Sequence, residues 1–188
     1  AIFIHIDWGY SMKRTKLDDR VLPEYTRGEE IFNMVTHIVG GVFGIAVLVL
    51  CIVFGVLRHN NYGIASGIIY GISMILLYTM SSIYHGLSPN TKSKKVFQIM
   101  DHCSIFVLIA GTYTPIVLCS IRPVDSFWAW MIFAVVWGCT VLGIILNAID
   151  IESNEKFSMI CYLAMGWCII FKFCLLYTSP SPRDTERS

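Results

Sequence analysis

Long apolar stretches that lack charged residues divide this chain into five segments. A helix needs about 20 apolar residues to cross the hydrocarbon layer of a membrane. Four of the stretches reach that length without a charge, and the fifth reaches it if Lys172 lies near an interface and extends toward it. The stretches are apolar all round, whereas a long helix of a soluble protein carries a polar stripe. We therefore predict membrane-spanning helices over residues of about 34–57, 62–85, 101–121, 127–149 and 157–177.

The composition supports an all-α, polytopic transmembrane bundle. Hydrophobic residues make up 55% of the 188 residues and charged residues 14%, with a mean hydropathy of +0.64. That is too few charges to cover a water-facing surface. A net charge of +1 without a dense basic stretch excludes a nucleic-acid partner, so the expected partners are membrane lipids and a lipid or small-molecule ligand. The cysteines stand singly without a C-x-x-C pair, which indicates packing residues.

Lys and Arg are unevenly distributed beside the predicted spans, and this bias sets the expected orientation. The first connection contributes Arg58 and the third contributes Arg122, while the fourth combines Lys156 with acidic residues. The N-terminal segment and the second connection are richer in basic residues. We therefore predict a multi-pass protein whose N-terminus and 86–100 loop lie in the cytosol. The basic residues on that side are Lys13, Arg14, Lys16, Arg20, Arg27, Lys92, Lys94 and Lys95.

The two ends of the chain differ from the bundle between them. Residues 1–11 begin with Ala1 and show no clear pattern, so we interpret them as a non-native leader. Residues 12–33 are basic and polar, as expected of a cytosolic segment, and the bundle covers 34–177. Residues 178–188 are rich in Pro, Ser and charge, and we interpret them as a non-native tail on a chain cut short.

Polar residues near the cytosolic ends of the second and third spans form a candidate site. Ser81 and His85 lie four residues apart, so they share one face of a helix. Glycines spaced by four over residues 63–71 would let a neighbouring helix approach that face, which places His85 in the bundle interior. The alternative is a histidine that caps the helix end at the membrane interface. Asp101 opens the third span at a similar depth, where a carboxylate is costly unless it is paired or bound to a cation.

These three side chains have the chemistry of part of a zinc site. Asp101 would be a ligand or would hold a bound water. Catalytic zinc uses three protein ligands and a water, and this cluster supplies at most one or two of them. His37, one turn inside the first span, is expected to be a packing histidine, although it could line the same cavity. His102 points about 100° away from Asp101 on a helix and is left outside the site.

Several ordered motifs resemble the hemolysin III family, which belongs with the progestin and adipoQ receptors, the adiponectin receptors and the monocyte-to-macrophage differentiation proteins. The resemblance runs from about Arg27 to Trp167. Its pieces are Glu29-Glu30-x-x-Asn33-x-x-Thr36-His37-x-x-Gly40, Ser81-Ser82-Ile83-Tyr84-His85, Asp101-His102, Ala110-Gly111-Thr112-Tyr113-Thr114-Pro115 and Tyr162-x-x-Met165-Gly166-Trp167.

The resemblance implies a seven-helix bundle with a cytosolic N-terminus, of which this chain contains five spans. It also implies a zinc ion held by three histidines, one from the second helix and a His-x-x-x-His pair from the last. By that resemblance His85 would be a ligand, Asp101 would hold or activate water, and Ser81 would support the site as a catalytic group. The chain departs from the pattern because it has no histidine beyond His102.

Three functions remain open from the sequence. The first is a zinc-dependent membrane hydrolase that cleaves a lipid amide, as a ceramidase does, with Asp101 as general base. The second is a non-enzymatic receptor or membrane-homeostasis protein in which zinc is structural. The third is a pore-forming cytolysin, for which the predicted spans hold few polar residues. Ser81, His85 and Asp101 fit the first two equally well.

Overall fold

The computed structural model describes residues 16–89 and 91–178, which form an all-α arrangement. The proposed leader at 1–11 and the tail residues 179–188 lie outside the described residues. The long helices succeed one another through short connections, and the third continues directly into a π-helical segment. The elements are η1 (Leu17–Asp19), α1 (Arg27–Leu57), α2 (Asn61–Gly86), α3 (Lys92–Pro115), η2 (Ile116–Ile121), α4 (Ser126–Ile149) and α5 (Ile151–Thr178).

The helices begin at polar caps that lie outside the apolar stretches. Thr26 caps α1 in a capping box, since its side chain accepts from the Glu29 amide while the Glu29 carboxylate accepts from the Thr26 amide at 2.8 Å. Thr91 likewise accepts from the amide of Lys94 at the start of α3. These two helices therefore start at Arg27 and Lys92, before the predicted spans, which start at residues 34 and 101. The predictions followed the charge-free stretches, which report the part of a helix inside the membrane, whereas the caps set where the helix begins.

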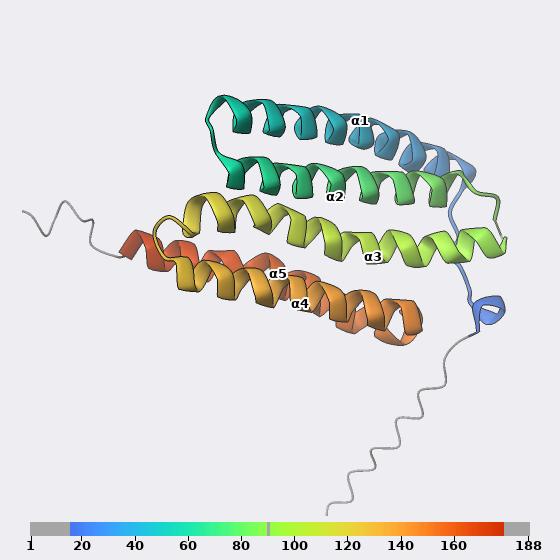
Figure 1. The fold of residues 1–188 in the computed structure, drawn as a ribbon. Coiled ribbons are helices and arrows are strands. Elements are labelled where there is room, and N and C mark those ends of the chain that lie inside the picture. Colours follow the sequence, from blue (N-terminus) through green and yellow to red (C-terminus); the bar gives the residue numbers. More distant parts are fainter. Residues whose placement is uncertain (1–15, 90, 179–188) are drawn as a thin grey trace, which may run out of the picture.

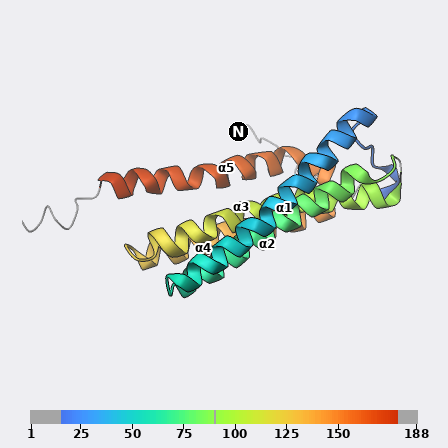
Figure 2. The same ribbon diagram turned by 90° about the horizontal axis from the view of Figure 1, so that it is seen from above.

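Helices α1 to α4 lie side by side in chain order (Figure 1), and α5 lies on one side of this layer (Figure 2). Two of the glycines predicted to permit close helix packing do so between α1 and α2. A Cβ added to Gly67 would overlap the Cβ of Cys51, and one added to Gly71 would lie 2.8 Å from the Cα of Leu48. Gly63 instead faces its own cap residue Asn60. The close approach therefore involves two of the three glycines.

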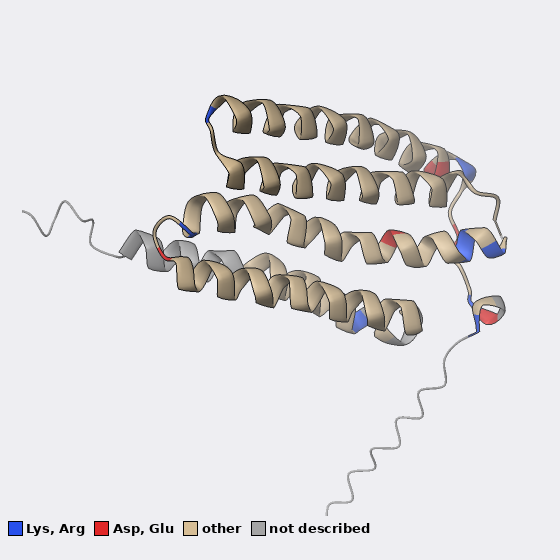
Figure 3. Cartoon of the chain, in the orientation of Figure 1, with Lys and Arg blue, Asp and Glu red and all other residues tan. Residues whose placement is uncertain are grey.

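Four helices are long and apolar enough to cross a membrane: α1, α2, α3 with η2, and α4. Helix α1 shows the lipid-facing character most clearly, because large side chains such as Val42, Phe43 and Phe54 are more than half exposed on it. Charged residues lie mostly at the ends of the bundle (Figure 3). The chain is thus a multi-pass membrane protein of five helices in its described part. The crossing by α5, a seven-span total and the orientation stay predictions.

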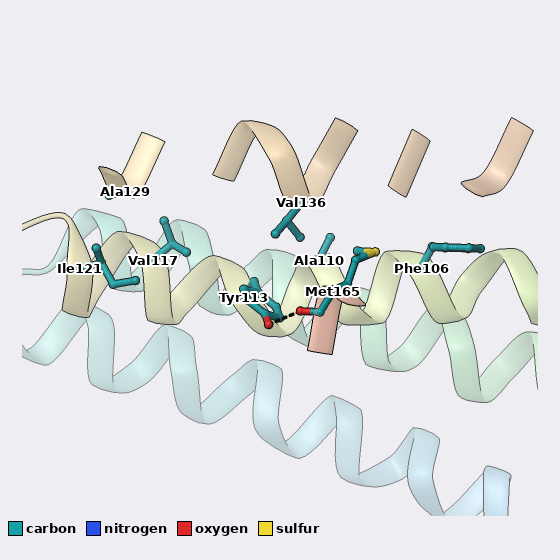
Figure 4. Close-up of a cluster of buried hydrophobic side chains, with 8 residues drawn as sticks. All are labelled: Phe106, Ala110, Tyr113, Val117, Ile121, Ala129, Val136 and Met165. Atoms are coloured by element: carbon teal, nitrogen blue, oxygen red, sulfur yellow. Dashed lines mark hydrogen bonds between the residues drawn. The ribbon is translucent and has the colours of Figure 1, made fainter. Parts of the chain in front are cut away.

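The apolar core lies between α3, α4 and α5 (Figure 4). Phe106 is fully buried, and a Cβ on Gly143 of α4 would collide with its ring. The hydroxyl of Tyr113 donates to the main-chain carbonyl of Met165, which ties α5 to α3. Helix α3 is therefore the central element of the bundle, and it also carries Asp101. The buried cluster consists of Phe106, Ala110, Tyr113, Val117, Ile121, Ala129, Val136 and Met165.

Candidate functional site

Asp101 and Ser81 meet between α3 and α2. Ser81 is 2% exposed, and its hydroxyl lies beside the Asp101 carboxylate. The same carboxylate interacts electrostatically with His85, His37 and His102. The structure therefore brings together the three residues that the sequence singled out, and it adds two more histidines to them.

His85 is buried at the end of α2, as predicted for an interior histidine, with 7% of its side chain exposed. Its Nδ1 lies 2.6 Å from a carboxylate oxygen of Glu30 on α1. Aromatic rings surround it, with centroids at 4.8 Å for Tyr84 and 5.7 Å for Tyr25. The imidazole thus has one directional contact, with Glu30, and is otherwise packed against rings.

Glu30 also joins α1 to α3. Its second carboxylate oxygen accepts from the Lys94 ammonium at 2.6 Å, and Lys94 donates as well to the carbonyl of Leu87 at 3.1 Å. Lys94 is only 2% exposed, which is rare for lysine unless it is paired. The carboxylate of Glu30 therefore bridges a cation from α3 and the imidazole of His85 from α2.

Sequence reasoning missed Glu30 and Lys94 as site residues. Glu30 counted only as a member of the ordered motifs, and Lys94 only as one of the basic residues that set orientation. A signal did exist for Glu30, because it precedes His37 by seven residues and so lies on the same face of α1. No comparable signal marks Lys94, since its role depends on how α3 is rotated against α1.

His37 and His102 also lie beside the predicted site. The ring centroid of His37 is 5.7 Å from that of His85, and its Nδ1 is buried without a hydrogen-bond partner. His102 has its Nδ1 2.9 Å from the carbonyl oxygen of Gln98. The sequence placed His102 outside the site, but His102 and Asp101 line the same cavity in the structure.

A cavity of about 500 Å³ opens beside the cluster, and Asp101, His102, His85 and Tyr84 are on its wall. A second cavity of about 490 Å³ has Glu30, Lys94 and Met34 on its wall. His85 and Tyr25 belong to both walls, so the cavity lined by Asp101 adjoins the one lined by Glu30. The first cavity is large enough for the polar end of a lipid or for a small molecule.

Comparison with known proteins identifies the family. The model of the Haemolysin-III related family matches residues 25–185 of the chain. The chain belongs to this family. Hemolysin-3 of Bacillus cereus is 37% identical over 154 residues, which cover 79% of the chain and 66% of that protein. The Hemolysin-3 homolog of Bacillus subtilis (strain 168) is 36% identical over 157 residues, which cover 84% of the chain and 72% of that protein.

The family match includes every residue of the polar cluster, from Tyr25 to His102. The resemblance inferred from the ordered motifs is thereby confirmed. The chain spans about two thirds of the length of the Bacillus cereus relative. No solved structure gives a significant match.

The donor set of this haemolysin III-type chain fits part of a zinc site. The described residues contain no group of three His, Cys, Asp or Glu side chains arranged to hold a metal ion. The imidazole of His85 and the carboxylate of Asp101 are nevertheless of the type that zinc prefers. The buried Nδ1 of His37 has no hydrogen-bond partner, and its ring centroid lies 5.7 Å from that of His85. The described residues would therefore supply part of a zinc site and not a complete one.

Proposed function

We propose that these helices are five of a seven-helix bundle that hydrolyses a lipid amide at one edge of the membrane. The observation that supports this proposal is the contact of Ser81 with Asp101 next to His85, where Asp101 and His85 lie on the wall of a cavity that residues 21–23 before α1 also line. A carboxylate at that position has a cost in free energy, and such residues in membrane helices usually serve a function.

Each residue of the cluster has a definite role in the proposed reaction. Asp101 accepts a proton from a water molecule held in the cavity as the water oxygen bonds to the amide carbonyl carbon, and it returns that proton to the nitrogen as the C–N bond breaks and the amine leaves. The Ser81 hydroxyl fixes the orientation of the carboxylate. His85 would hold zinc through the ring nitrogen that does not face Glu30. The ion, when bound, supplies Lewis acidity to the amide carbonyl and acidifies water. The apolar helix faces admit the acyl chains from the bilayer.

Zinc content and amide hydrolysis test this proposal together. The purified protein is assayed in lipid nanodiscs with a fluorescent long-chain amide, beside Asp101→Asn and His85→Gln. We expect Asp101→Asn to lower the rate by about 10²- to 10⁴-fold, in line with loss of a general base, and His85→Gln to lower zinc content as well. Asp125→Asn, which changes the N-cap carboxylate of α4 near the opposite end of the bundle, is the control. Equal turnover by Asp101→Asn and the unaltered protein would refute the hydrolase proposal.

A receptor with structural zinc is the second candidate. The contacts of Glu30 favour it, because one carboxylate joins α1, α2 and α3, so a ligand that moved His85 would move three helices. Zinc binding without turnover in the same assay would support this role over the hydrolase.

Pore formation is the third candidate, and the name of the Bacillus relatives raises it. Buried hydroxyl groups in the described spans, such as those of Ser73, Thr114 and Thr140, donate to main-chain carbonyls of their own helices. They are therefore already engaged in hydrogen bonds that do not require water. Dye release from vesicles at protein levels that give no hydrolysis would favour the pore.

A further inference from the structure

The carboxylate of Glu30 does more than join three helices, because it also contacts one nitrogen of the His85 ring. It contacts the Nδ1 of His85 and the ammonium of Lys94 through different oxygens, each at 2.6 Å. Neutral imidazole carries one N–H and one lone pair, and the partner of one nitrogen decides which nitrogen has the proton. An ionised carboxylate only accepts hydrogen bonds, so it selects the form of His85 with the proton on Nδ1.

We propose that Glu30 is a positioning residue that fixes the Nδ1–H tautomer of His85 and so directs the lone pair of Nε2 toward Asp101. This inference deepens the proposed function and rests on it for the identity of the ion. Metal-binding histidines generally donate their other ring N–H to a carboxylate or carbonyl, which fixes the ring orientation and raises the basicity of the ligand. His85 lies on the wall of the cavity that Asp101 lines and of the cavity that Glu30 lines, and its Nδ1 faces Glu30.

Lys94 completes the arrangement from α3. Because it is buried and donates to both Glu30 and Leu87, its position is fixed by two acceptors. Its charge compensates the carboxylate, which would otherwise be poorly solvated among apolar helices. Lys94 therefore keeps one oxygen of Glu30 occupied and leaves the other for His85.

Glu29 provides a matched control within the same turn of α1. It closes the capping box with Thr26, and its carboxylate is hydrogen-bonded there rather than to His85 or Lys94. Glutamine is also accepted at this capping position. Glu29→Gln and Glu30→Gln therefore make the same chemical change at adjacent positions, and only the second alters the contact with His85.

The first measurement is the tautomer of His85 in the metal-free protein, by ¹⁵N NMR of histidine-labelled protein in nanodiscs at a pH well above the usual histidine range. The signals of His85 are identified by their loss in His85→Gln. We expect the Nδ1–H form in the unaltered protein and in Glu29→Gln, and a shift toward Nε2–H in Glu30→Gln. An Nε2–H form of His85 in the unaltered protein would overturn the proposal, and this measurement requires no variant of Glu30 to fold.

The second measurement is the apparent zinc affinity, by competition with a chelator. Loss of the group that orients a metal-binding histidine costs about 10- to 100-fold in metal affinity, so we expect that loss in Glu30→Gln and none in Glu29→Gln. Equal losses in both variants would indicate a general effect on α1 and contradict a positioning role. Absence of zinc binding in every version would refute the zinc-dependent function, whereas the tautomer would still decide the role of Glu30.

Discussion

The two ends of α3 are held by different kinds of interaction. Near its start, Lys94 and Asp101 have polar partners on α1 and α2. Farther along, Phe106 and Ala110 are buried by close packing against α4 and α5. Van der Waals packing tolerates changes that keep volume and shape, whereas a buried charge tolerates no loss of its partner. The apolar part of α3 therefore stabilises the bundle, whereas its polar start is suited to chemistry.

Removing one member of the ion pair between Lys94 and Glu30 should have the largest effect on stability. Lys94→Met leaves the carboxylate of Glu30 largely buried with only His85 as a partner, and removal of one member of a buried pair costs about 3–5 kcal/mol. The double variant Lys94→Met/Glu30→Gln should recover much of that loss, because no unpaired charge remains. Thermal unfolding in detergent measures both. A double variant no more stable than Lys94→Met would contradict this account of the pair.

Truncation in the apolar region should cost slightly less and leave the site intact. Phe106→Ala removes a fully buried ring between α3, α4 and α5. We expect the free energy of unfolding to fall by about 3 kcal/mol, which is the lower end of the range for such changes. The loss is at the lower end because side chains that lose this packing contact lipid as well as water. Zinc affinity of the folded fraction should stay unchanged. A drop in affinity comparable to that of Glu30→Gln would show that the two regions of α3 are coupled.

Overpacking between α1 and α2 should have a smaller effect. In Gly71→Ala the new Cβ would lie 2.8 Å from the Cα of Leu48, so the helices must separate, at a cost of about 1–3 kcal/mol. Gly138→Ala is the control, since nothing lies within 4 Å of its added Cβ. That variant should be neutral or stabilising by about 0.5–1 kcal/mol, because alanine favours helix over glycine. Chemical denaturation of both variants checks the difference, and equal destabilisation would count against close α1–α2 packing.

Removal of the hydroxyl that supports Asp101 should change turnover without loss of zinc. Ser81→Ala removes a polar partner of the carboxylate, worth about 1.5–3 kcal/mol at most for a charged acceptor, and leaves His85 in place. Hydrolysis should therefore fall by less than in Asp101→Asn, while zinc content stays constant. A complete loss of zinc in Ser81→Ala would place Ser81 closer to the ion than this account allows.

Much of the bundle could be predicted from the sequence because charge gaps report membrane thickness directly. Four of the five predicted spans match candidate membrane helices, and Ser81, His85 and Asp101 converge as their depths implied. The depth of a residue in the membrane is its position along a single axis, and hydropathy reports that position well. The contacts of Glu30 and Lys94 depend on the rotation of α1 and α3 about their axes, which apolar-all-round helices do not encode in their periodicity.

Zinc stoichiometry combined with amide turnover tests the central claim most directly. The account predicts about one zinc per complete bundle, and turnover that is lost in Asp101→Asn while the protein remains folded. Folded protein that binds zinc but hydrolyses no long-chain amide would contradict the hydrolase and favour the receptor. Folded protein that binds no zinc would contradict the metal site itself.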